Sequence, residues 1–175
     1  MEEARPTVED LQAALDKSRA ETRSAFENRA LMYAYLYEEL VPVLGREDTA
    51  ALMKRAIYRR GLEVGRKYRD AAQESDMAEV GTIFCDGSPC AGGLFDPGVE
   101  ERSDGRIVLR MTSCPLIDAW KAADLPAEEI DTLCGIAAAV DEGTFDGAGL
   151  DLNFLSRLGA GDAKCLLDLR VPTDE

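Results

Sequence analysis

The spacing of the apolar residues changes after residue 76, and this change constrains the fold more than any other feature. Through residues 7–41 and 47–73 apolar side chains recur at intervals of three and four, which predicts two amphipathic helices. Thr7 is placed to cap the first helix, and Pro42 and Gly45 to end it. After residue 76 the period becomes two, the repeat of a β-strand. The chain therefore contains helices first and a sheet later.

The later segments alternate between hairpins and helices. Strands are predicted over residues 79–85, 106–112, 150–157 and 164–171, and helices over 116–122 and 126–140. The order is two N-terminal helices, an antiparallel hairpin, a helix pair and a second hairpin. Such segregation is typical of an α+β fold with one mainly antiparallel sheet. We expect a single domain over residues 1–175, with a helical part over 1–75 and a ββααββ part over 76–175.

Two glycines interrupt the second predicted helix on one of its sides. Gly61 and Gly65 are four residues apart. Each costs a helix about 1 kcal/mol relative to alanine. The cost predicts that another helix backbone or a ligand approaches closely at this side.

The charge of the chain limits its partners. Twenty Lys and Arg residues against 34 Asp and Glu residues give a net charge of −14, which repels nucleic acid. No run reaches the ~18–20 apolar residues that a membrane helix needs. The charged N-terminus lacks the apolar core of a secretion signal, so we expect a cytoplasmic protein. The tyrosines at 33, 35 and 37 cannot share one helix face, and a homo-oligomer contact is one use for them.

The positive charges gather in one segment of the second helix, namely Lys54, Arg55, Arg59, Arg60, Arg66, Lys67 and Arg69. Two interpretations stay open: a solvated helix face, or a site for an acidic ligand or partner.

Histidine is absent from the chain, which excludes much site chemistry. There is no Ser-His-Asp triad, no Cys-His pair and no histidine metal site. A general base must be a carboxylate, Lys, Tyr or a thiolate. The five cysteines are expected to be reduced, because no secretion signal is predicted.

Cys114 is the strongest candidate for chemistry. It follows a predicted strand, and Pro115 opens the next helix. Free N–H groups at a helix N-terminus stabilise an anion, so a lowered pKa and a nucleophilic thiolate are expected. Asp118, one turn later, is placed to orient a substrate or accept a proton. The alternative is an inert cysteine at a buried corner.

The remaining candidates lie further along the chain. Cys134 and Cys165 fall on apolar faces, where burial is the default interpretation. Together with Cys114 they form the thiol set of an alternative zinc site. Asp141 lies in a Gly-rich segment that predicts a turn over 141–149, and partial burial would make it a general base. The Gly-rich loop over 86–105 is a candidate lid.

These C-terminal motifs resemble the L-2-amino-thiazoline-4-carboxylic acid hydrolase family. The resemblance covers residues 110–170 best. It is carried by the run Thr112-Ser113-Cys114-Pro115, then Trp120, Leu125, Leu133-Cys134, Asp141, Gly161 and Cys165. The segment 159–165 also looks like the end of the vinyl-reductase-type ligand-binding domains, some of which hold zinc through cysteines.

The first resemblance implies a small-molecule hydrolase that opens a cyclic amidine of the thiazoline type at a C–N or C–S bond. Cys114 as a thiolate, or water activated by Asp141, would attack the carbon between nitrogen and sulfur. Cys134 and Cys165 accompany them in the implied site, and Arg110 or Lys121 would bind a substrate carboxylate. No cofactor is required. The second resemblance implies a non-catalytic binding module, with or without zinc.

Overall fold

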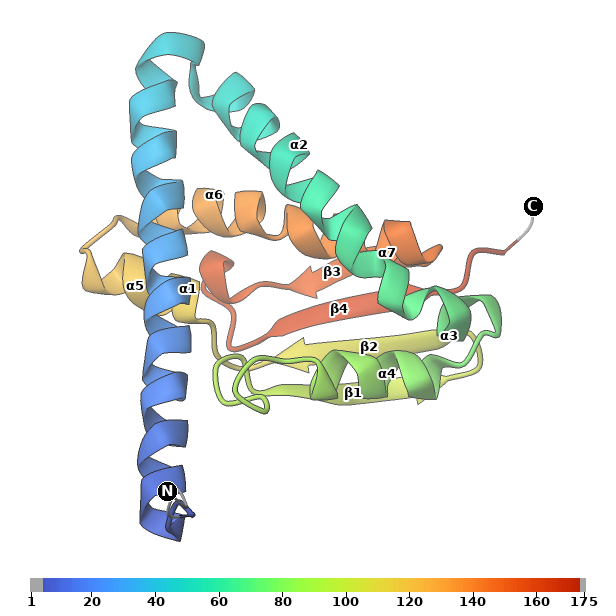
Figure 1. Ribbon diagram of the computed structural model, residues 1–175. Helices are drawn as coiled ribbons and strands as arrows, with labels where there is room; N and C mark the ends of the chain where they lie inside the picture. The colour runs from blue at the N-terminus through green and yellow to red at the C-terminus, as the bar shows by residue number, and fades with distance from the viewer. Residues whose placement is uncertain (1–4, 174–175) are drawn as a thin grey trace.

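The computed structural model describes residues 5–173, in which helices pack against one sheet (Figure 1). The elements are α1 (Val8–Leu44), α2 (Arg46–Gly65), the 3-10 turn η1 (Arg66–Tyr68), α3 (Arg69–Gln73), α4 (Met77–Asp86), β1 (Pro97–Ser103), β2 (Arg106–Met111), α5 (Pro115–Ala122), α6 (Ala127–Ala137), α7 (Ala139–Ala148), β3 (Asp151–Ser156), η2 (Leu158–Ala160) and β4 (Cys165–Arg170). The described strands form an antiparallel sheet in the order β1-β2-β4-β3. The predicted α+β class is confirmed.

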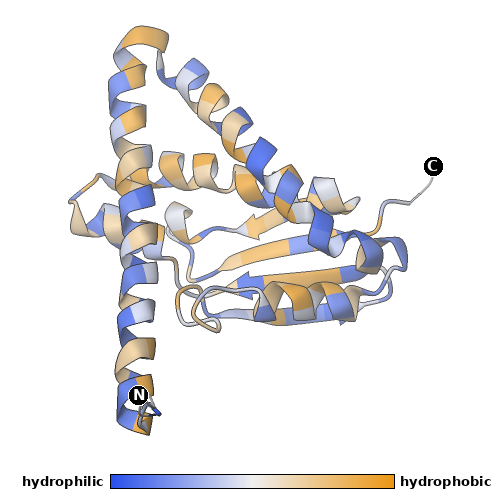
Figure 2. Ribbon diagram, viewed as in Figure 1, coloured by the Kyte–Doolittle hydropathy of each residue, from blue (hydrophilic) through white to orange (hydrophobic). Residues whose placement is uncertain are grey.

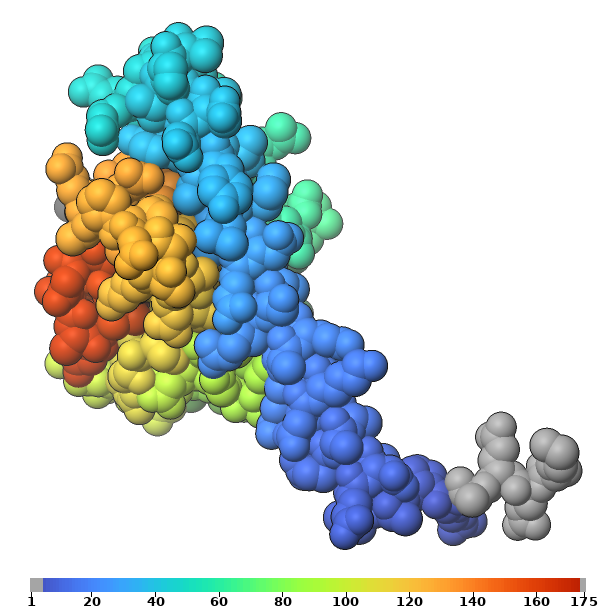
Figure 3. Space-filling view, turned by 90° about the vertical axis from the view of Figure 1, so that its left-hand side faces the viewer, coloured from blue at the N-terminus to red at the C-terminus, as the bar shows by residue number. Residues whose placement is uncertain are grey.

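Helix α1 begins and ends where local chemistry dictates. The Asp10 N–H donates to the Thr7 hydroxyl at 3.2 Å, and the Thr7 N–H donates to the Asp10 carboxylate at 2.9 Å. The prediction that Pro42 helps to end the helix is wrong, because the helix continues to Leu44 and ends at Gly45, which has a φ of 83° and donates its N–H to the Val41 carbonyl. Its N-terminal turns project beyond the body of the molecule (Figure 3). Within residues 5–173, no helix has both the length and the apolar content that crossing a membrane requires.

The predicted strand over 79–85 is wrong, because this segment is helix α4. The Asp76 carboxylate accepts from the N–H groups of Ala78 and Glu79 at 3.1 and 3.0 Å and caps the helix. Met77, Val80 and Gly81 then lie buried on one helical face. A short apolar run fits both periods, and the cap decides between them.

Strand β1 lies inside the segment that was predicted to be a loop over 86–105. It pairs antiparallel with β2, with Val99 opposite Leu109. β1 is an edge strand and buries little. Its sequence is therefore polar and contains Gly and Pro, without the alternating apolar residues from which a strand is predicted. The remaining loop, residues 87–96, connects α4 to β1.

The predicted turn over 141–149 is also wrong, because it is helix α7. A Cβ at Gly61 would lie 2.3 Å from the Val140 carbonyl oxygen, and one at Gly143 would lie 2.1 Å from that of Tyr58. Gly65 and Gly147 are packed against the opposite helix in the same way. These glycines let the α2 and α7 backbones touch. The close approach predicted at Gly61 and Gly65 is confirmed, and the partner is a helix.

The hydrophobic core consists of two clusters of buried residues. On the sheet side, Ile107, Leu109, Leu167 and Leu169 are buried together with Val80, Tyr68 and Phe145. Figure 2 shows the hydrophobic colour along much of β2 and β4. The second cluster joins α1, α5 and α6, and in it the Trp120 indole N–H donates to the Ala30 carbonyl at 2.8 Å.

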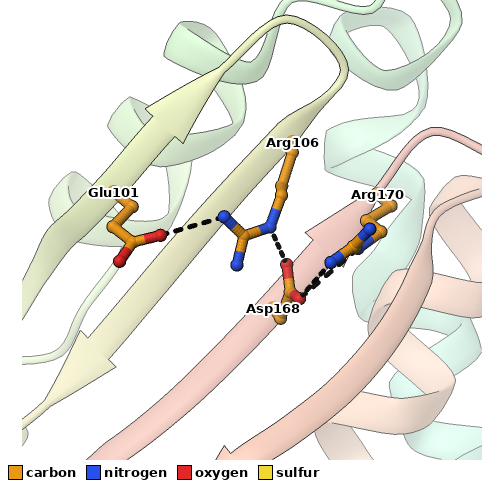
Figure 4. A network of polar contacts seen from close by, with 4 residues as sticks. All are labelled: Glu101, Arg106, Asp168 and Arg170. Carbon is orange, nitrogen blue, oxygen red and sulfur yellow. Dashed lines mark hydrogen bonds and ion pairs between the residues drawn. The ribbon is translucent and has the colours of Figure 1, made fainter.

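A charged network links strands across the sheet (Figure 4). The buried Asp168 carboxylate accepts from Arg106 Nε at 2.7 Å and from Arg170 Nη2 at 2.9 Å. Arg106 Nη1 also donates to Glu101 Oε2 at 2.9 Å. The two guanidinium groups lower the pKa of Asp168, although burial alone would raise it.

Candidate active site

A cavity of about 660 Å³ lies between the two buried clusters. Its aromatic walls are Phe26, Tyr33, Tyr68, Phe84, Phe95, Trp120 and Phe154. The 87–96 loop closes one side, because Phe95 lies edge-on to Phe26 of α1 with 5.4 Å between the ring centres. The cavity is within the size range of small-molecule sites.

Cys114 lines this cavity at the start of α5. The backbone N–H groups of Leu116 and Ile117 lower its pKa, as expected of a helix terminus. Burial has a larger effect and raises the pKa of Cys114 to about 11. The net shift is therefore opposite to the predicted one, and near neutral pH the group is a thiol.

Cys134 and Cys165 line the same cavity, so the fold brings all three candidate cysteines together. Burial raises the pKa of Cys134 and raises that of Cys165 to about 11. The Leu158 N–H donates to Cys165 Sγ at 3.3 Å. A Cβ at Gly159 would lie 2.2 Å from Cys134 Cβ, so η2 packs directly on this cysteine. All five cysteines of the chain are free thiols.

The alternative zinc site is not formed. In the part of the chain that the structure describes, no group of three or more Cys, Asp or Glu side chains is arranged to hold a metal ion. Cys114, Cys134 and Cys165 share a cavity wall without the convergence that tetrahedral coordination needs.

Among the residues that the structure describes, Asp141 is the one carboxylate that lines the cavity. It lies in the first turn of α7, where the helix dipole would favour the ionised form. Desolvation by the cavity walls dominates and, with the nearby charge of Glu142, raises the pKa of Asp141 to about 7. The residue as a whole is half-buried and lines the cavity.

The three other predicted site residues do not line the cavity. Arg110 lies 3.8 Å from the carboxylates of Asp96 and Glu100, because alternate residues of β2 point away from the core. Asp118 lies on the outer side of α5, 3.8 Å from Arg23. Lys121 is exposed on the same helix.

Sequence reasoning missed several residues that do line the cavity. Arg157 follows β3 and donates from Nη2 to Asp131 Oδ1 at 2.9 Å. Tyr68 and Lys67 come from η1. Lys67 belongs to the basic segment, whose density was the available signal, but no local pattern separates it from its solvated neighbours.

Comparisons with known proteins were made against this geometry. Residues 23–169 match the family described as L-2-amino-thiazoline-4-carboxylic acid hydrolase. No curated protein matches the chain. A solved trafficking protein particle complex subunit 3 from Naegleria fowleri, covalently bound to palmitic acid, is similar with a TM-score of 0.55 and 12% identity, over 85% of this chain and 96% of that one. The phenol-responsive sensory domain of the transcription activator PoxR, solved with phenol, has a TM-score of 0.44 and 16% identity over 81% and 73%. The first of these structures shares the fold.

Proposed function

The chain belongs to the L-2-amino-thiazoline-4-carboxylic acid hydrolase family, which indicates a hydrolase-type function, and from this premise we propose that it opens a cyclic amidine of the thiazoline type inside the cavity. The proposed reaction is hydrolysis of a C–N or C–S ring bond. Asp141 is the proposed general base.

The observation that carries the proposal is the environment of Asp141. A carboxylate held by a cation would have a low pKa and be a weak base, whereas neither cause of the Asp141 shift involves a cation. With a pKa of about 7, the group accepts and returns a proton near neutral pH. A chain without histidine has few other groups with this property.

The proposed steps conserve atoms and charge. Asp141 takes one proton from water as the water oxygen bonds to the ring carbon between nitrogen and sulfur. The C=N bond becomes a C–N bond, and Asp141 returns the proton to the ring nitrogen, which gives a neutral tetrahedral adduct. Asp141 then accepts the hydroxyl proton of the adduct as the carbonyl forms and one ring bond breaks, and it passes this proton to the leaving nitrogen or sulfur. The carboxylate is regenerated.

The cysteines have a lesser part in this proposal. As a thiol with a pKa of about 11, Cys114 is a thiolate in only about one molecule in ten thousand near pH 7. We therefore assign Cys114, Cys134 and Cys165 to the wall that desolvates Asp141. Attack by the Cys114 thiolate is the competing mechanism.

The test is turnover of 2-amino-thiazoline-4-carboxylate by the wild type, Asp141→Asn and Cys114→Ala. Asp118→Asn, outside the cavity, is the control. A free thiol in the product identifies C–S cleavage, and a free amine identifies C–N cleavage. We expect Asp141→Asn to lower kcat by about 100-fold or more, the size of a lost general base. Cys114→Ala should stay within about tenfold.

Two results would overturn this assignment. Full activity of Asp141→Asn would remove its base, and loss of activity only in Cys114→Ala would establish the competing mechanism. Binding of the compound by the wild type without turnover would instead favour a binding module.

A further inference from the structure

The charge of the cavity is opposite to that of the chain. Over residues 5–173, four cationic side chains line it, Arg29, Arg60, Lys67 and Arg157, against the single carboxylate of Asp141. The chain as a whole carries −14. An acidic protein repels anions from most of its surface, so a cationic cavity selects them at one place.

Lys67 and Arg29 are the two lining cations that no carboxylate engages within residues 5–173, since Arg60 and Arg157 are each paired at 2.9 Å, with Glu63 and Asp131. Arg29 stacks on the Phe26 ring, with 4.6 Å from its guanidinium carbon to the ring centre, which leaves Lys67 as the cation we assign to a ligand. Within residues 5–173, Lys67 forms no ion pair. Its ammonium lies 5.0 Å from the centre of the Tyr68 ring.

The Lys67 ammonium lies beside Gly87, where a Cβ would be 2.9 Å from Lys67 Nζ. The amine is partly desolvated by the cavity, which lowers its pKa. The Lys67 side chain as a whole is exposed, but it lines the cavity without a counter-charge among residues 5–173, so an anion bound in the cavity would pair with it.

The cavity is larger than a thiazoline carboxylate needs. Its volume of about 660 Å³ is typical of sites for drug-sized ligands. Its aromatic and aliphatic walls would stay unfilled around a lone five-membered ring. An apolar substituent against these walls would gain about 25 cal/mol for each Å² removed from water.

We propose that the ligand of this cavity is an amphipathic organic anion, with its acidic group paired to Lys67 and an aromatic or branched apolar body, larger than the thiazoline ring, against the aromatic walls. That this anion is the substrate rests on the proposed function. Its binding at Lys67 rests on the cavity alone.

The test uses two fluorescent probes that differ by one charge, 8-anilinonaphthalene-1-sulfonate and the neutral N-phenyl-1-naphthylamine. Trp120 is the single tryptophan of the chain and lines the cavity, so energy transfer from it reports binding there. We expect saturable binding of both probes at one site per chain. Lys67→Met should weaken the sulfonate about tenfold and leave the neutral probe unchanged. Lys67→Arg should restore sulfonate binding, and Lys54→Met, exposed on α2, should change neither.

Equal sulfonate affinity in Lys67→Met and wild type would overturn the proposal. So would loss of both probes in Lys67→Met, because the residue would then shape the cavity rather than bind the anion. Neither probe is turned over, so these results are separate from the activity of the Asp141 variants.

Discussion

The pKa of the Asp141 carboxyl group is set by two features of its surroundings. Burial removes water from it, and Glu142 adds a like charge. Both penalise the ionised form, so both raise the pKa. The result is a base whose proton exchange is centred near pH 7.

This shift predicts a stability cost at the proposed active site. The unfolded carboxyl titrates near its ordinary pKa of 3.8 and the folded one near about 7, so between these values only the folded state keeps the proton. The free energy of unfolding should therefore fall as pH rises through this window. Asp141→Asn cannot ionise and should be about 2 kcal/mol more stable than the wild type at pH 8.

Urea unfolding at pH 4 and pH 8 measures this effect. The advantage of Asp141→Asn should shrink by pH 4, because the Asp141 carboxyl group of the folded wild type is then protonated and as neutral as the amide. A variant equally stable or less stable at pH 8 would mean that burial does not penalise the Asp141 charge.

Helices α2 and α7 determine where Asp141 lies. The glycines of both helices let the backbones touch. The position of α7 relative to the cavity is therefore fixed by backbone contacts, which a change of side-chain rotamer cannot relieve. This dependence on backbone contact distinguishes Gly61 from Gly81, whose added Cβ would meet only side-chain atoms, 2.9 Å from Ile107 Cδ1 and 3.1 Å from Val99 Cγ2.

Gly61→Ala should lower the free energy of unfolding by about 3 kcal/mol or more, despite the better helix propensity of alanine. Gly81→Ala is the matched control and should lose about 1 kcal/mol or less, since the Ile107 and Val99 side chains can move. Chemical denaturation gives both values. Equal effects of the two substitutions would show that the α2–α7 contact yields more easily than its geometry implies.

The Asp168 network makes the sheet dependent on one buried charge. Asp168→Asn should cost about 2–3 kcal/mol, because it removes the carboxylate shared by Arg106 and Arg170 and leaves Arg106 with only the exposed Glu101 as counter-charge. Glu101→Gln removes the exposed end of the same network and should cost less than about 1 kcal/mol.

The pH dependence of this contribution has a fixed sign. The pKa of Asp168 is lowered in the folded state, so its stabilisation is present above about pH 4 and is lost as pH falls through the folded pKa. Acid unfolding of the wild type and Asp168→Asn should therefore converge below that pKa. Parallel curves down to the lowest pH would contradict the role given to the ionised carboxylate.

At the scale of the whole molecule, the features predicted correctly are those fixed by nearby residues. Thr7 and Gly45 bound α1 through local caps, and Pro115 opens α5 as expected. Gly143 and Gly147 were interpreted as turn residues, because only the distant backbone of α2 shows why a helix needs them. The sequence from Glu79 to Cys85 is compatible with a strand. The Asp76 cap and the packing of Met77 and Val80 against the sheet make it a helix.

The same division holds for the site. Cys114, Cys134, Asp141 and Cys165 were predicted as candidates, and the fold brings them to one cavity. Arg110 and Lys121 were chosen for their closeness to Cys114 in sequence, yet alternation along β2 and the outer side of α5 take them elsewhere. Lys67 and Arg157 reach the cavity only through tertiary packing, which no local pattern encodes.

The most direct test of Asp141 as the base is the pH dependence of kcat/KM for ring opening. The account predicts a rise with pH that levels off above about pH 7, as Asp141 ionises. Glu142→Gln should move the midpoint to lower pH, since it removes the like charge, whereas Glu128→Gln on α6 should not. A rate that keeps rising toward pH 11, where the Cys114 thiol ionises, would contradict the account and assign the chemistry to sulfur.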